Sequence, residues 1–283
     1  MRLVRMSCYN NRMGVDFFAG IIIFLFGAVV GSFLNVVILR LNTGQSIVSG
    51  RSKCFSCAKK LKWYELLPIA SFIFLRGKCS ACKTKISWQY PITEIITGLL
   101  FLLIFNFQWP IFNEFSFYFI IYTFHLFVVF SILIIIAVYD YRHQIIPNLF
   151  VWIFNILAFL NLFVWDLIRN SDLEIRNFDY SSLLSGFILF SFFALLWGVS
   201  RGRWMGFGDA KLALGIGWLL GITKGITAIT LAFWIGAVVG VLLIYLNKNK
   251  YGLKSSIAFG PFMILGTAVS FFWGEKIIGF LFR

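Results

Sequence analysis

The chain has 283 residues, of which 60% are hydrophobic and 35 are Phe, and its formal charge is +14. A mean hydropathy of +0.88 is too high for a protein with a single soluble core. The positive charge does not indicate nucleic-acid binding, because the basic residues flank apolar runs and do not form an aromatic-interleaved strip. We therefore expect a membrane protein whose basic residues contact anionic lipid headgroups.

Uncharged runs define the expected helices in chain order. Runs long enough to cross about 30 Å of hydrocarbon cover residues 17–39, 95–113, 115–139, 144–165, 180–200, 225–247 and 255–274. A further uncharged run, residues 212–223, is short enough to be either a re-entrant segment or a thin crossing. These runs predict an all-α polytopic membrane protein.

Basic residues predict which loops face the cytoplasm, because Lys and Arg in short loops are retained on that side. Ten of the 25 lie within residues 40–85, so we place this block inside. The loops at residues 201–211 and 248–254 then also face inside, which requires residues 212–223 to cross the membrane. The expected total is therefore about eight transmembrane helices.

One block, between the first two apolar runs, is polar enough to form a separate domain. Its composition shifts to Lys, Ser, Gly and Cys. No small-residue cleavage site follows the first run, so we expect this run to remain as an anchor. The expected organisation is an N-terminal tail (residues 1–14), a first transmembrane helix (15–39), a cytoplasmic four-cysteine domain (40–90) and a multi-helix membrane domain (91–283).

Four cysteines in the polar block have the spacing of a metal site. Cys54 and Cys57 form one Cys-x-x-Cys pair, Cys79 and Cys82 form a second, and 21 residues separate the pairs. Two such pairs can bring four thiolates into a tetrahedron around zinc, as in zinc ribbons. The alternative is a pair of disulfides, which a reducing cytosol disfavours. Because four cysteines leave no position for water, the zinc is expected to be structural.

Two aspartates stand where apolar runs break. Asp140 follows the third run, and Asp209 lies in Gly206-Phe207-Gly208-Asp209, where the glycines permit close approach of backbone or substrate. The predicted orientation places both acids at the cytoplasmic rim. Two carboxylates within a few ångströms share one proton, so one can activate water while the other protonates a peptide carbonyl. The alternative for each is a solvated boundary residue, because interfacial acids cost little.

These motifs, taken in order, resemble the bacterial type IV prepilin peptidases, a family of GxGD-type aspartyl membrane proteases. The likeness covers nearly the whole chain. It rests on Gly31-Ser32-Phe33-Leu34-Asn35-Val36, the two Cys-x-x-Cys pairs, Trp63-Tyr64-Glu65-Leu66-Leu67-Pro68, Leu75-Arg76-Gly77-Lys78-Cys79, Ile86-Ser87-Trp88-Gln89-Tyr90-Pro91 with Glu94, Asp140 with Ile146-Pro147-Asn148, Gly206-Phe207-Gly208-Asp209-Ala210-Lys211-Leu212, and Phe259-Gly260-Pro261-Phe262.

The resemblance implies a bifunctional enzyme of the bacterial inner membrane. Such enzymes cut the basic leader from type IV prepilins and type II secretion pseudopilins, after a glycine at the cytoplasmic face. They then methylate the new N-terminal residue, commonly Phe, with S-adenosyl-L-methionine as donor. For this chain the resemblance implies Asp140 and Asp209 as the catalytic pair. The implied metal ligands are Cys54, Cys57, Cys79 and Cys82.

Three further residues are candidates for supporting roles, and two other functions stay open. Gly206 and Gly208 would shape the turn at Asp209, and Lys211 would support the acid pair if it pointed inward, although extension to the membrane surface is simpler. Glu94 could orient the methyl donor, or could be a solvated cap on its helix. The alternative functions are a related GxGD protease without methyltransferase activity, and a non-enzymatic zinc-ribbon protein of membrane assembly or transport.

Overall fold

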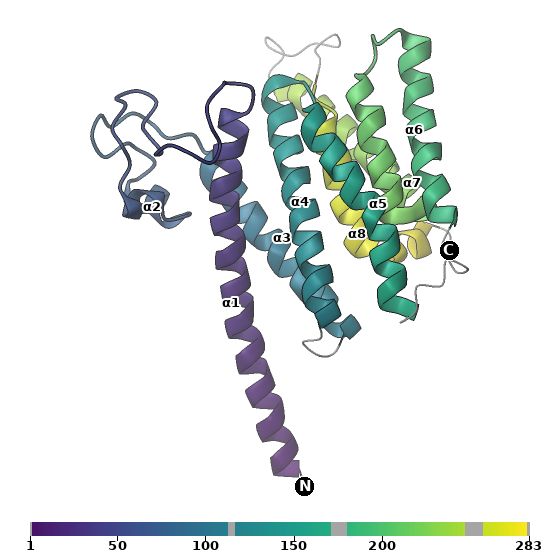
Figure 1. Cartoon of the computed structure of the whole chain (residues 1–283), viewed down its shortest axis with the longest axis horizontal. Coiled ribbons are helices and arrows are strands. Elements are labelled where there is room, and N and C mark those ends of the chain that lie inside the picture. Colours follow the sequence, from purple (N-terminus) through teal and green to yellow (C-terminus); the bar gives the residue numbers. More distant parts are fainter. Residues whose placement is uncertain (1, 113–116, 171–179, 247–256, 282–283) are drawn as a thin grey trace. The chain divides into compact units, whose positions relative to one another are not determined.

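The computed structural model describes residues 2–112, 117–170, 180–246 and 257–281. Over these residues the chain is helical, with two isolated β-bridges, so the all-α prediction is confirmed for this part. The helices, labelled as in Figure 1, are α1 (Arg2–Arg40), the 3-10 helix η1 (Trp63–Leu66), α2 (Ala70–Phe74), α3 (Gln89–Phe112), α4 (Phe117–His143), α5 (Asn148–Asn170), α6 (Tyr180–Ser200), α7 (Phe207–Leu246) and α8 (Gly260–Leu281). The predicted loop at residues 248–254 lies outside the described residues.

Six of the described helices are long and apolar enough to cross a membrane, namely α1, α3, α4, α6, α7 and α8. The apolar part described for α5, Asn148–Phe163, is shorter. Helix α7 is broken at Gly221, whose φ of 74° and ψ of 179° are not helical, a conformation that glycine adopts without steric cost. If its two segments are counted separately, the helices described outside residues 41–88 number eight, which roughly matches the prediction.

Helix α3 begins at Gln89, two residues before the predicted start of the membrane domain at residue 91 and six before the uncharged run of residues 95–113. In the structure, the Thr93 hydroxyl donates to the Gln89 carbonyl within the same helix at 2.8 Å, and Glu94 is buried. Polar side chains satisfied inside a helix bundle need not end a helix.

The described chain forms two compact units, Met1–Ser131 and Ile132–Arg283, and each is described by itself. In the first unit, α1 packs against α3. A Cβ atom on Gly27 would lie 2.8 Å from the Gly98 Cα, and one on Gly31 would lie 2.8 Å from the Glu94 Cα. Small residues four apart let two membrane helices approach this closely, which explains the glycine of the Gly31-Ser32-Phe33 motif.

In the second unit, α7 is the central helix and packs against α5, α6 and α8 (Figure 1). Its N-terminal half is almost entirely apolar or glycine, and Leu212 and Ile216 on this half are fully buried, as are Phe154 of α5, Phe193 of α6 and Met263 of α8. The acid of the Gly-x-Gly-Asp motif lies in the first turn of this buried helix. Its position is therefore fixed by packing on three sides.

Candidate active site and metal centre

Asp140 lies near the C-terminus of α4 and is 4% exposed. Its Oδ2 accepts a hydrogen bond from the backbone N–H of Gly260 at 3.0 Å. Gly260 is the first residue of α8, and the N–H groups of a first helical turn lack partners within the helix. A Cβ atom at this position would lie 2.6 Å from Oδ2, so glycine is required for the contact. The Phe259-Gly260-Pro261-Phe262 motif was notable in the sequence only for its resemblance to the family, and this hydrogen bond assigns a role to its glycine.

Asp209 lies in the first turn of α7 and is 6% exposed. Its backbone N–H donates to the Gly206 carbonyl at 3.2 Å, which closes the turn of the Gly-x-Gly-Asp motif. A negative side chain in a first helical turn is also stabilised by the helix dipole. Neither aspartate is therefore the solvated boundary residue that the sequence left as an alternative.

The two carboxylates come together within the second unit. Asp140 is close enough to Asp209 to act on it electrostatically. Ile146 lies against both supporting backbones, because Cβ atoms on Gly208 and Gly260 would lie 2.9 Å from its Cβ and 3.5 Å from its Cδ1, respectively. The loop that follows Asp140 thus packs between the first turns of α7 and α8.

The residues predicted to support Asp209 differ in what they do. Gly208 has no room for a side chain, whereas a Cβ atom on Gly206 would meet nothing closer than 3.8 Å. Lys211 Nζ donates to Asn148 Oδ1 at 2.9 Å and lies 5.4 Å from the centre of the Phe207 ring. Lys211 therefore links α7 to the start of α5, and no ion pair between it and Asp209 is found among the described residues.

The four cysteines are brought together in the first unit. Their sulfur atoms all lie within 4.8 Å of one another, and the Cys54 and Cys82 sulfurs are 3.8 Å apart. Zinc bound by sulfur at about 2.3 Å in a tetrahedron has sulfur–sulfur edges of about 3.8 Å. The donor set and its spacing therefore fit a four-thiolate zinc site, as the sequence predicted.

Two similar turns carry the cysteine pairs. Cys54 N–H donates to the Lys59 carbonyl at 3.0 Å, and Cys79 N–H donates to the Thr84 carbonyl at 2.9 Å. An isolated antiparallel bridge closes each turn, between Lys53 and Lys60 in the first and between Lys78 and Lys85 in the second. Each cysteine pair is thus held by its own local backbone hydrogen bonds.

Glu65 joins the two turns, a role that the sequence did not indicate. Its Oε1 accepts from Lys59 Nζ at 2.9 Å and from the Ser80 hydroxyl, and its Oε2 accepts from the Lys62 N–H at 2.8 Å. The hydrogen bond from Lys62, followed by those from Ser80 and Lys59, lowers the pKa of Glu65 to about 2. A buried carboxylate with three donors is stable only in its ionised form.

Glu94 is buried in α3 and is not the solvated cap considered from the sequence. Its Oε2 accepts from the backbone N–H of Ile69 at 2.7 Å. Ile69 precedes α2 and has a φ of 61°, an unfavourable conformation for a β-branched residue. Glu94 therefore fixes α2 to α3, and any part it takes in methyl transfer would come in addition to this role.

Comparisons with known proteins cover nearly the whole chain. The family described as "Bacterial Peptidase A24 N-terminal domain" matches residues 25–107, and the "Type IV leader peptidase family" matches residues 127–241, which include both aspartates. A prepilin leader peptidase/N-methyltransferase of Bacillus subtilis (strain 168) is 30% identical over 262 residues, covering 93% of this chain and 97% of that protein. Proteins of the same name from Legionella pneumophila and Pseudomonas aeruginosa are each 28% identical, covering 92% and 89% of this chain and 93% and 90% of those proteins. No solved structure gives a significant match.

Proposed function

Because the chain belongs to the type IV leader peptidase family, we propose that it cleaves the leader from type IV prepilins and methylates the N-terminal residue that the cut exposes. We assign the cleavage to Asp140 and Asp209. The relatives that share the name prepilin leader peptidase/N-methyltransferase align over both units of the chain. This full-length likeness supports both activities over a protease without methylation and over a non-enzymatic membrane protein.

The observation that carries the catalytic assignment is the pair of buried, interacting carboxylates. Both are less than 10% exposed, and the carboxylate of Asp140 accepts a backbone hydrogen bond from Gly260 that holds its position. Acids that served only to end a membrane helix would face water or headgroups. Buried carboxylates that influence each other are the arrangement expected of an aspartyl protease.

Hydrolysis by this pair needs one ionised and one protonated carboxyl group. The ionised group takes a proton from water while the water oxygen bonds to the scissile carbonyl carbon, and the protonated group donates to the carbonyl oxygen. The carbonyl then reforms as its oxygen returns its proton to the carboxylate that supplied it, the carbon–nitrogen bond breaks, and the leaving amine takes the proton that came from water. The burial of both groups favours a shared proton, because low dielectric strengthens the repulsion between two charges.

The finer assignments follow from the same family. The proposed substrates include pseudopilins of type II secretion, and the proposed methyl donor is S-adenosyl-L-methionine. The cysteine set would hold a structural zinc ion, since four thiolates leave no ligand position for water. The cluster of basic residues within 40–85 supports a cytoplasmic orientation of the metal domain, and the proposed location is the bacterial inner membrane.

The test of the catalytic pair is cleavage of a precursor with a Gly-Phe junction in a membrane preparation. Asp209→Asn and Asp140→Asn should each abolish cleavage. The amide that replaces the carboxyl group can neither accept a proton from water nor share a proton with the remaining aspartate. Glu275→Gln is the matched control, since it makes the same chemical change at an exposed acid paired with Lys224. Cleavage that persists in either aspartate variant would contradict the assignment.

Methylation is tested separately on the product of the same reaction. Mass spectrometry of the mature N-terminus, with and without S-adenosyl-L-methionine, should show one added methyl group only when the donor is present. An unmethylated product in both cases would leave the protease assignment intact and would favour the GxGD protease without methyltransferase activity.

A further inference from the structure

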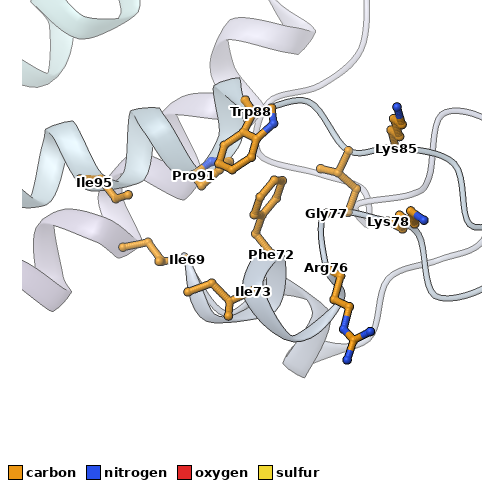
Figure 2. A pocket seen from close by; sticks show the side chains of 11 residues that line it. Ile69, Phe72, Ile73, Arg76, Gly77, Lys78, Lys85, Trp88, Pro91 and Ile95 are labelled. Carbon is orange, nitrogen blue, oxygen red and sulfur yellow. The ribbon is translucent and has the colours of Figure 1, made fainter.

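The first unit contains a pocket of about 600 Å³ whose lining includes neither aspartate (Figure 2). Its walls come from α2, from the residues on both sides of the second cysteine pair, and from the start of α3. Phe72 and Trp88 form one wall, with ring centres 4.9 Å apart. The volume falls in the range of about 300–1,000 Å³ that is usual for small-molecule sites.

The lining of this pocket is divided into an apolar part and a basic part. Figure 2 shows the isoleucines Ile69, Ile73 and Ile95 on one side of the aromatic pair and the basic residues Arg76, Lys78 and Lys85 on the other. No acidic side chain lines the pocket. Its ligand should therefore carry an apolar segment joined to a negatively charged group.

The apolar part of the pocket coincides with the start of a membrane-spanning helix. Ile95 belongs to the candidate span Gln89–Gln108, and Trp88, which precedes α3, is 69% exposed. Exposed tryptophans at the ends of spanning helices are typical of the membrane–water interface. On α2, Ile73 and Phe74 are also exposed, at 65% and 81%. The basic part then lies where lipid headgroups would be.

We propose that this pocket binds one anionic phospholipid. Its phosphate lies between Lys78 and Lys85 and within reach of Arg76, and its acyl chain follows Ile73 and Ile95 toward the hydrocarbon. Lys78 and Lys85 oppose each other across an isolated antiparallel bridge, where two like charges would repel unless an anion lay near both. The three basic residues and the absence of an acid from the lining select an anionic headgroup over a zwitterionic one.

The other ligands of the proposed enzyme fit this lining less well. A basic leader peptide would be repelled by the three cationic side chains. S-adenosyl-L-methionine carries a sulfonium and an ammonium group against one carboxylate, and the lining offers no carboxylate to receive them. An anionic amphiphile is the one class that matches both parts of the pocket.

The chain offers a matched control for the basic part. Lys53 and Lys60 oppose each other across the equivalent bridge of the first cysteine turn, but neither lines the pocket. The double variants Lys78→Gln/Lys85→Gln and Lys53→Gln/Lys60→Gln therefore make the same change of charge in the same structural setting. Only the first should affect lipid binding at the pocket.

The experiment uses the full-length protein in nanodiscs that contain a photoactivatable phosphatidylglycerol or, separately, a photoactivatable phosphatidylcholine, with labelled peptides mapped by mass spectrometry. Phosphatidylglycerol should label residues 69–95 at least about fivefold more than phosphatidylcholine. A preference of this size corresponds to the attraction of one basic residue to an anionic lipid surface. Lys78→Gln/Lys85→Gln should reduce this labelling by at least about fivefold. Lys53→Gln/Lys60→Gln should leave the labelling within about twofold of that of the parent protein, because charges outside the site are screened by salt.

Bound zinc per chain serves as the folding check for all variants. If Lys78→Gln/Lys85→Gln loses its zinc, Ile73→Ser provides the second test, because this side chain is exposed and its loss should reduce labelling without unfolding the domain. Equal labelling by both lipids, or equal loss in both lysine variants, would overturn the proposal. If soluble glycerol phosphate reduced the labelling, the pocket would be a phosphate site. If S-adenosyl-L-methionine reduced the labelling, the pocket would bind the methyl donor. Either result would also overturn the proposal.

Discussion

At the scale of single residues, the acid pair depends on backbone groups that only glycine can bring close enough. Gly260 gives its N–H to Asp140, and Gly208 lets Ile146 lie against the turn that carries Asp209. The same two contacts place the loop after α4 against both first turns. The geometry of the carboxylates therefore depends on the absence of two side chains as much as on the acids themselves.

The two glycines of the Gly-x-Gly-Asp motif should differ in their tolerance of alanine. In Gly208→Ala the new Cβ would lie 2.9 Å from the Ile146 Cβ, which cannot turn away because it is attached to the backbone. The turn must shift, and displacement of a catalytic group by about 1 Å can cost roughly 100-fold in rate. We expect a loss of this order in kcat for precursor cleavage.

Gly206→Ala is the control for that loss, because its Cβ would meet nothing closer than 3.8 Å and its N–H is retained. Cleavage by this variant should stay within about threefold of the parent, as expected where no catalytic contact changes. Equal losses in the two variants would mean that the motif requires the backbone flexibility of its glycines, and not the space that Gly208 leaves for Ile146.

Glu65 should make the metal domain sensitive to acid. Its pKa of about 2 lies below the ordinary value of 4.5, so folding favours the ionised form. The stability that it contributes is fully present above about pH 4.5 and is lost as the pH falls from there toward 2. Glu65→Gln, which mimics the protonated acid, should weaken the domain by about 1.5 kcal/mol or more at neutral pH, the usual worth of a hydrogen bond to a charged group.

Hydrogen–deuterium exchange of a peptide spanning residues 59–66 measures this effect. Exchange should be about tenfold faster or more in Glu65→Gln at pH 7, since 1.4 kcal/mol corresponds to a factor of ten. The difference should narrow as the pH falls from 4.5 toward 2, because the unfolded chain binds a proton at Glu65 below about pH 4.5 and the folded parent does so only near pH 2. Both proteins keep the same four cysteines, so acid release of the metal affects them equally. If the difference in exchange rate did not depend on pH, the ionised form of Glu65 could not be its cause.

At the scale of elements, close packing of α1 on α3 should depend on Gly31. A Cβ atom there would lie 2.8 Å from the Glu94 Cα and 3.0 Å from the Thr97 Oγ1. Overpacking of this kind costs about 1–3 kcal/mol, so Gly31→Ala should lower the free energy of unfolding in detergent by that amount. Gly20→Ala on the same helix is the control, because its Cβ would meet only the end of the Leu102 side chain, at 3.3 Å. Equal stability of the two variants would contradict tight packing at Gly31.

Helices were predictable from the sequence where charge alone marks their ends. Residues 180–200 were expected as an uncharged run, and α6 has these bounds. The break in α7 was expected at Lys224, but it lies at Gly221, because backbone conformation and not charge decides where a helix turns. The sequence suggested that Glu94 could cap the start of α3, but its burial was not predictable because its partner, Ile69, lies 25 residues away.

Candidate site residues were predictable as types but not as contacts. The acids and cysteines stand out because such side chains are rare in a chain that is 60% hydrophobic, and each class has few roles in a membrane protein. The N–H that holds Asp140 comes from Gly260, 120 residues away. No local pattern encodes such a pairing, because it joins the end of α4 to the start of α8.

At the scale of the whole molecule, the two candidate centres belong to different compact units. The four cysteines, Glu65 and the pocket lie in the first unit, and both aspartates with their glycine partners lie in the second. Every contact described for the acid pair comes from the second unit. The metal centre should therefore stabilise its own domain without holding the carboxylates in place.

Removal of the metal by a chelator that binds zinc tightly tests this separation. Folding of a small four-cysteine domain is coupled to metal binding, so the segment between α1 and α3 should lose its structure. This segment contains nine of the chain's basic residues after Arg40, and trypsin should cut it rapidly once the metal is gone. A parallel sample to which zinc is returned before trypsin is added controls for effects of the chelator on the membrane.

Cleavage of a precursor in the same chelated preparation, without trypsin, should continue within about threefold of the untreated rate, because no catalytic contact is lost. A fall in cleavage that tracks the loss of metal and recovers when zinc is returned would show that the metal domain stabilises the acid pair or presents the substrate. Cleavage that persists while residues 41–88 become sensitive to trypsin would locate the peptidase in the second unit, as the contacts of Asp140 and Asp209 require.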